Sequence, residues 1–261
     1  MTALPMTAAA ADAAAADPSV CLAVAGIDKS FGGIRALTDC SLAVRQGSIT
    51  ALIGPNGSGK TTLFNCITGF YEPDGGQVYV RGVPVNRRRP SDIVHLGVMR
   101  TFQVTRIFRR MTVLENMIVP IRQLTLRSLF TAAIKGHERE RAEALLAFFG
   151  LEGLRDEQAG TLSFGQQKLL ELASALMAEP EIVLLDEPAG GLNPIMIDKL
   201  AGHVRELNGR GVTFLIIEHN MGFVMNLCDP VIVMHRGTVI AQGSPGAVRE
   251  DPIVLDAYLG D

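Results

Sequence analysis

The sequence predicts an α/β protein with a partly parallel sheet, and three apolar segments carry that prediction. They span residues 48–54 (SITALIG), 181–188 (EIVLLDEP) and 212–219 (VTFLIIEH), and each is a short run of branched residues typical of a buried strand. Segments with helical spacing follow them, as in strand–helix–strand units. Each run ends in glycine or polar side chains, and open α/β sheets bind ligands at that edge.

The composition excludes some classes of protein. The 261 residues are 48% hydrophobic and 20% charged, which suits one or two globular domains with ample core. A net charge of −3, few aromatic residues and no Trp argue against a nucleic-acid partner. The four cysteines show no C-x-x-C spacing, so reduced thiols are expected. No uncharged apolar run reaches the ~18 residues of a membrane span.

The first residues are rich in alanine. The segment MTALPMTAAAADAAAADPSV carries Asp12 and Asp17 before the first basic residue, Lys29, whereas a secretory signal begins with positive charge. We therefore expect residues 1–19 to be a disordered tail and residues 20–261 to form a single domain.

The first buried strand leads into a glycine-rich loop. Residues 54–61 fit the P-loop pattern G-x-x-x-x-G-K-[ST], and the following TTLFNCITGF has helical spacing. Phosphate oxygens need many close donors, so Gly57 and Gly59 are expected to let backbone N–H groups approach. The helix N-terminus adds positive potential. Lys60 would reach the β- and γ-phosphates, and Thr61 would ligate Mg²⁺.

The chain then changes character. Residues 71–82 (YEPDGGQVYVRG) predict a turn and a strand, so the region before them is rich in sheet. Residues 137–150 and 163–180 predict amphipathic helices, the second with an S-x-x-Q capping box formed by Ser163 and Gln166. We expect an α/β core over 20–95 and 179–261, interrupted by a helical subdomain over 96–178.

An acidic pair and a capped helix mark the return to the core. Asp186 ends an apolar strand, where a carboxylate can hold Mg²⁺ through its water shell. The adjacent Glu187 is placed to orient or deprotonate an attacking water. Asn193 and Pro194 predict the N-cap and first residue of the next helix.

The motifs together resemble the ATP-binding subunit of an ABC transporter. Residues 162–167 (LSFGQQ) correspond to the family signature, with Phe164 in place of its first glycine, and residues 189–193 (AGGLN) depart from the usual loop by placing Asn193 where Asp is common. The resemblance implies a P-loop NTPase core with an antiparallel β subdomain and an inserted helical subdomain. It also implies ATP and Mg²⁺ as ligands.

The resemblance assigns the site residue by residue. Glu187, His219 and Gln103 would be catalytic, and Thr61, Gln103 and Asp186 would hold the metal. Phe31 would stack on adenine, although a core phenylalanine is the alternative. The nucleotide contacts implied are Phe31, Gly54, Pro55, Asn56, Gly57, Ser58, Gly59, Lys60, Thr61, Thr62, Ser163, Gly165 and Gln166.

Longer segments are similar to one ATPase of branched-chain amino acid importers. The similarity implies transmembrane permease subunits, a second ATP-binding subunit whose identity with this chain stays open, and indirectly a solute-binding protein. It also implies a position at the cytoplasmic face of the inner membrane, held by the permeases. Another solute or lipid export remains an alternative. A soluble ABC ATPase of DNA repair or translation, and a module that binds nucleotide without hydrolysis, are less favoured. A GTPase is disfavoured because no N-K-x-D motif occurs.

Overall fold

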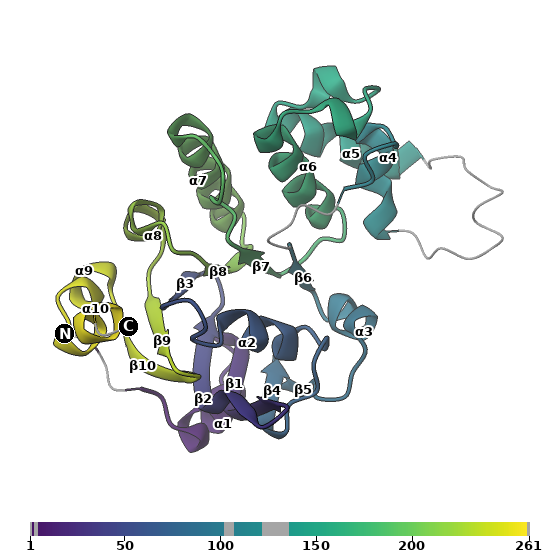
Figure 1. Cartoon of the computed structure of the whole chain (residues 1–261). Coiled ribbons are helices and arrows are strands. Elements are labelled where there is room, and N and C mark those ends of the chain that lie inside the picture. The colour runs from purple at the N-terminus through teal and green to yellow at the C-terminus, as the bar shows by residue number, and fades with distance from the viewer. Residues whose placement is uncertain (1, 3–4, 102–106, 122–135, 260–261) are drawn as a thin grey trace.

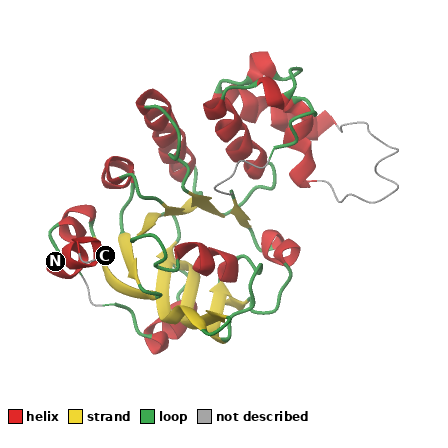
Figure 2. Cartoon of the chain, viewed as in Figure 1, coloured by secondary structure: helices red, strands yellow, loops and turns green. Residues whose placement is uncertain are grey.

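The computed structural model describes residues 2, 5–101, 107–121 and 136–259. These residues form two sheets and a separate lobe of helices (Figures 1 and 2). Among them, no helix combines the length and the apolar composition that crossing a bilayer requires.

A six-stranded sheet forms the centre of the core. Its order is β10-β9-β3-β8-β7-β6, and all neighbours are parallel except β10 against β9. Because the strands from β6 to β9 are parallel, their carboxyl ends meet at one edge. The strands are β3 Ile49–Ile53, β6 Val98–Arg100, β7 Ile182–Asp186, β8 Thr213–Ile217, β9 Val231–His235 and β10 Thr238–Gly243.

A second, four-stranded antiparallel sheet has the order β2-β1-β4-β5. It supplies the antiparallel β subdomain that the resemblance implied. Its strands are β1 Val20–Phe31, β2 Ile34–Arg45, β4 Gly75–Val80 and β5 Val83–Pro84.

Alternating residues of β7 enter two different hydrophobic cores. Ile182 and Leu184 pack with α2 (Lys60–Ile67) and the antiparallel sheet, so that α2 lies between the two sheets (Figure 1). Val183 and Leu185 pack with helices on the opposite face. This two-residue period is that of a strand buried on both sides. The remaining helices of the core are α3 Pro90–His95, α7 Pro194–Gly209, α8 Met221–Leu227, α9 Pro245–Arg249 and α10 Pro252–Leu259.

The helical lobe contains α4, α5 and α6. The predicted capping box is confirmed, because Ser163 and Gln166 each bond the other's backbone N–H at the start of α6. Leu169, Leu170 and Leu172 are buried, as their spacing predicted. The elements are α4 Val113–Ile118, α5 Gly136–Phe149 and α6 Phe164–Leu176, with short 3₁₀ turns at Val119–Ile121, Glu152–Leu154 and Ala159–Thr161.

The lobe does not coincide with the range 96–178. Strand β6 falls inside that range, yet it pairs with β7 and belongs to the central sheet. A three-residue edge strand gives too short a pattern for sequence periodicity to distinguish from a loop.

The prediction of a disordered tail over residues 1–19 is wrong for its central part. Residues Ala8–Ala15 form helix α1, capped by Thr7. Ala11 is fully buried, and Ala15 packs with Val20 and Ala23 of β1. A Cβ on Gly26 would lie only 3.1 Å from the Cβ of Ala8. The small side chains that suggested disorder instead let the helix lie close against the sheet.

Candidate functional site

The glycine-rich loop connects β3 to α2, and its three glycines have different surroundings. All three have positive φ: 151° at Gly54, 80° at Gly57 and 100° at Gly59. A Cβ at Gly54 would lie 2.1 Å from the Met234 carbonyl oxygen, and one at Gly59 would lie 2.6 Å from that of Ala36. Only Gly57 has open space at that position. Gly57 is thus the one of the three with room beside its backbone for an approaching group, whereas Gly54 and Gly59 seat the loop against the core.

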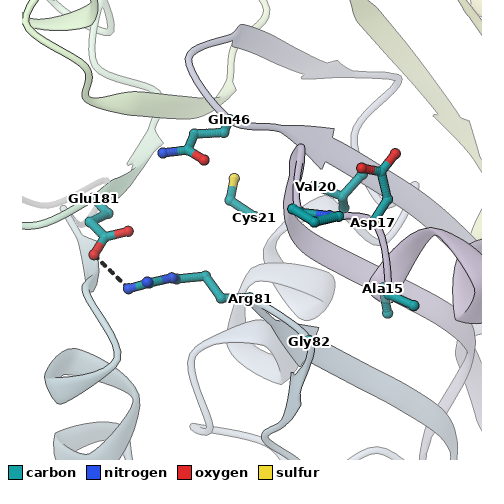
Figure 3. Close-up of a pocket in the computed structure, with 10 residues that line it drawn as sticks. Ala15, Asp17, Val20, Cys21, Gln46, Arg81, Gly82 and Glu181 are labelled. Atoms are coloured by element: carbon teal, nitrogen blue, oxygen red, sulfur yellow. Dashed lines mark hydrogen bonds and ion pairs between the residues drawn. The ribbon is translucent and has the colours of Figure 1, made fainter.

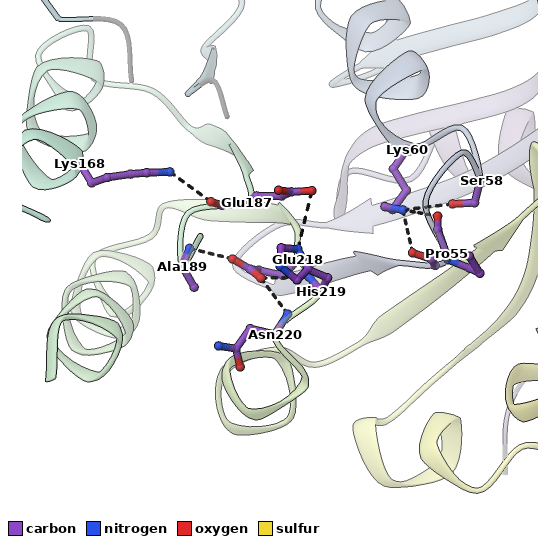
Figure 4. Close-up of polar contacts among 10 residues, drawn as sticks. Pro55, Ser58, Lys60, Lys168, Glu187, Ala189, Glu218, His219 and Asn220 are labelled. Carbon is purple, nitrogen blue, oxygen red and sulfur yellow. Dashed lines mark hydrogen bonds and ion pairs between the residues drawn. The ribbon is translucent and has the colours of Figure 1, made fainter. Parts of the chain in front are cut away.

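Lys60 closes the loop around its own ammonium group. Its Nζ donates to the carbonyls of Gly54 and Pro55, each at 2.7 Å, and to the Ser58 hydroxyl at 3.2 Å (Figure 4). Burial lowers the pKa of Lys60, and the nearby carboxylates of Glu187 and Asp186 oppose that shift. The loop therefore holds a cation at its centre, as a triphosphate site requires.

The loop is supported on its outer side by the turn between β9 and β10. The N–H of Gly237 donates to the Ser58 carbonyl at 3.0 Å. A cavity of about 360 Å³ lies between the loop and this turn, lined by Pro55, Asn56, Gly57, Ser58, His235 and Arg236. In the first turn of α2, Thr61 is exposed to solvent and Thr62 is half-buried.

The acidic pair lies at the carboxyl end of β7. Asp186 is buried, and its Oδ2 accepts a hydrogen bond from Nη2 of Arg100 at 2.7 Å. Glu187 has a φ of 50°, a left-handed conformation that is costly for a non-glycine residue. The Glu187 N–H donates to Ile217, and its carbonyl accepts from Lys168 and Gly190. These bonds hold the strained backbone in place.

His219 follows β8, the strand beside β7. Because Asp186 pairs with Ile217 in the parallel register, the residues after them also meet. Nδ1 of His219 lies 3.7 Å from Oε1 of Glu187. The structure therefore brings together two of the three residues that the resemblance assigned to catalysis.

Glu218 was not predicted from the sequence. Its side chain is buried and accepts three backbone N–H bonds, from Ala189 at 2.7 Å and from His219 and Asn220 at 2.9 Å each (Figure 4). One carboxylate thus ties the loop after Glu187 to the loop that carries His219. Its only signal in the sequence was an acid at the end of a buried strand.

The signature residues lie on the helical lobe. Ser163 is exposed as the N-cap of α6, and Gly165 lies against Met196 of α7. Phe164 is half exposed, and a Cβ on Gly191 would lie 3.0 Å from its ring. The phenylalanine that replaces the family's glycine at position 164 therefore packs beside Gly191, in the loop before α7, where a side chain would crowd its ring. Asn193, the other departure, caps α7 through a bond from the Met196 N–H.

Phe31 is 42% exposed, so the alternative of a core phenylalanine is wrong. Its ring meets Tyr71 edge to face with centroids 5.1 Å apart, and Nζ of Lys29 lies 5.5 Å from the ring centre. The ring is available for stacking. Gln103, predicted to sense the metal, lies outside the described residues.

The donors present fit ATP and Mg²⁺. The loop offers backbone N–H groups and a held ammonium, and the Asp186 carboxylate with the Thr61 hydroxyl supplies the hard oxygen ligands that Mg²⁺ prefers. A second cavity, of about 400 Å³, lies elsewhere, lined by residues that include Cys21, Gln46, Arg81 and Glu181 (Figure 3). None of the residues predicted for the site lines it.

Comparisons with known proteins match this chain to ATP-binding proteins of ABC transporters. The model of the ABC transporter family matches residues 37–190, and that of the branched-chain amino acid ATP-binding cassette transporter matches residues 238–261. The high-affinity branched-chain amino acid transport ATP-binding protein LivG of Salmonella typhimurium is 43% identical over 249 residues, which cover 92% of this chain and 98% of LivG.

Solved structures are similar over nearly the whole chain. The ADP conformation of an ATP-binding cassette from an ABC transporter has a TM-score of 0.84 at 39% identity, covering 93% of this chain and 99% of that one. A dimeric post-hydrolysis cassette bound to ADP and phosphate has a TM-score of 0.74 at 25% identity, covering 86% and 98%.

Proposed function

Since this chain belongs to the ABC transporter family of ATP-binding proteins, we propose that it powers an importer of branched-chain amino acids. The chain is an ATPase with an ATP-binding cassette fold. The substrate rests on the likeness to LivG over 92% of the chain and on the match of the C-terminal residues 238–261.

The observation that carries the mechanism is the meeting of three elements at one sheet edge. Three groups lie at the carboxyl ends of parallel strands: the loop that encloses the Lys60 ammonium, the acidic pair at the end of β7, and His219 after β8. The ammonium and the loop amides bind the phosphates. Glu187 orients and deprotonates the attacking water, and His219 contacts the γ-phosphate. Phosphoryl transfer requires positioning and charge stabilisation, so no covalent nucleophile is involved.

Mg²⁺, when bound, neutralises charge that develops on the β- and γ-phosphates. The Asp186 carboxylate and the Thr61 hydroxyl would hold it, with Gln103 as a further ligand. Phe31 would stack on the adenine.

The signature would act on the nucleotide of a second ATP-binding subunit. Ser163 and Gly165 lie at an exposed helix N-terminus on the separate lobe, which favours binding of an anion presented by another chain. ATP would then stabilise a closed dimer, because it binds the closed state more tightly than the open one. Hydrolysis would remove this stabilisation and let the dimer open. Permease subunits would hold the pair at the cytoplasmic face of the membrane.

Uptake in the host tests the proposal. Deleting the gene should abolish high-affinity uptake of radiolabelled leucine, isoleucine and valine. The wild-type gene should restore uptake and Glu187→Gln should not, while a change at the exposed Glu250 serves as the control. Normal branched-chain uptake in the deletion strain, with loss of another solute, would contradict the proposed substrate.

A further inference from the structure

Arg100 ends β6 and forms a buried ion pair with the acid proposed to hold the metal. Its Nη2 lies 2.7 Å from Oδ2 of Asp186, and the two side chains are only 5% and 4% exposed. A charge in such a place requires a partner with good geometry, because neither member is solvated by water. One oxygen of the Asp186 carboxylate is therefore committed to the guanidinium.

The other side of the guanidinium contacts α2. Nη1 of Arg100 donates to Oδ1 of Asn65 at 2.6 Å and lies 3.5 Å from the Thr68 hydroxyl. The guanidinium also lies over the Phe64 ring, 5.4 Å from its centre. The planar guanidinium of Arg100 thus links α2, which follows the phosphate loop, to the end of β7. A lysine, with a single ammonium, would not bond both in this geometry.

We infer that Arg100 is a positioning residue for Mg²⁺. It fixes Oδ2 of Asp186, so that the carboxylate keeps one orientation relative to Thr61 at the start of α2. Carboxylates around metals depend on such outer partners, whose loss typically costs about 10- to 100-fold in metal affinity. This inference rests on the proposed role of Asp186.

A merely structural ion pair would behave differently, and β7 offers a comparison. At its other end, Arg81 contacts Glu181 at 2.6 Å, with side chains 56% and 47% exposed (Figure 3). Arg81→Met removes an arginine from an ion pair whose acid, Glu181, directly precedes β7 at the end far from the proposed metal. It serves as the control for the loss of an exposed arginine ion pair.

The experiment measures Mn²⁺ binding by electron paramagnetic resonance, with saturating ATP and with Glu187→Gln in every chain to prevent turnover. Arg100→Met should weaken Mn²⁺ binding by about 10- to 100-fold. Asn65→Ala keeps the ion pair but removes the shorter of the two hydrogen bonds from Arg100 to α2, and should weaken binding by about 3- to 10-fold. ATP affinity without metal should change less than about threefold in both, and Arg81→Met should match the parent.

Mn²⁺ affinity within about twofold of the parent in Asn65→Ala and Arg100→Met would overturn the inference. If Arg100→Met does not fold, Asn65→Ala decides the question alone. Asp186→Asn separates the two levels of the account. If Asp186→Asn leaves the Mn²⁺ affinity unchanged, the proposed metal site is wrong. If Asp186→Asn weakens Mn²⁺ binding while Arg100→Met and Asn65→Ala do not, only the role of Arg100 is wrong.

Discussion

The buried carboxylate of Glu218 gives the most informative single change. It accepts N–H bonds from Ala189, His219 and Asn220 at 2.7–2.9 Å. Glu218→Ala leaves all three donors without their acceptor. Because Glu187 and His219 lie on the two loops that this carboxylate joins, the change should affect stability and hydrolysis together.

The magnitude follows from the burial of the donors. A hydrogen bond to a charged group contributes about 1.5–3 kcal/mol, and an unpaired buried donor costs about 1–3 kcal/mol. Ala189 is buried, so its N–H is left without an acceptor. His219 is exposed and Asn220 is half exposed, so their N–H groups can bond to water instead. We expect the free energy of unfolding to fall by about 3 kcal/mol. Glu218→Gln, which retains one carbonyl oxygen, should cost about half as much.

The assay pairs urea unfolding with ATP hydrolysis at saturating ATP. A misplacement of about 1 Å can reduce a rate by roughly 100-fold, so Glu218→Ala should lower kcat by about 10- to 100-fold. Glu250→Ala, at a side chain 79% exposed, is the control and should change neither quantity. If the free energy of unfolding of Glu218→Ala lies within about 0.5 kcal/mol of the wild type and its kcat within about twofold, then Glu218 does not hold the two loops together.

Three further predictions concern the catalytic acid, the first helix and the buried thiols. Glu187→Gln should bind ATP normally and accumulate a closed dimer with hydrolysis reduced at least about 100-fold; near-normal turnover would contradict its role. Ala11→Glu should undock α1 and lower the free energy of unfolding by about 1–3 kcal/mol, whereas Ala13→Glu, on the exposed side, should be neutral; equal effects would show that the helix does not pack as described. Burial raises the pKa of Cys40 and Cys228 to about 12, so above pH 9 the unfolded state loses protons that the folded state keeps. Unfolding free energy should therefore fall by about 1.4 kcal/mol per pH unit per thiol, and an unchanged slope after replacing both thiols by alanine would contradict this.

Local patterns were sufficient to predict the strand, loop and helix around Lys60 and the capping box at Ser163. Both depend on contacts between residues close in sequence, and each has a specific spacing. The approach of Glu187 and His219 could also be anticipated, because parallel strands end at one edge of a sheet.

Residues whose role depends on distant partners could not be predicted. Glu218 and Asp186 are both acids at the end of apolar strands, and the sequence does not show that one accepts backbone bonds while the other pairs with Arg100. The docking of α1 was missed for a similar reason. An alanine-rich segment has little pattern of its own, and the contacts that seat the helix, such as Ala15 with Val20 and Ala23, join it to the facing sheet.

Equilibrium binding of ATP is the decisive measurement for the role of the loop around Lys60. In the presence of Mg²⁺, the Glu187→Gln chain should bind ATP with micromolar or tighter affinity. Adding Lys60→Ala should weaken that affinity by at least about 100-fold, because the ammonium enclosed by Gly54, Pro55 and Ser58 is lost. Absence of ATP binding, or equal binding with and without Lys60, would contradict the account.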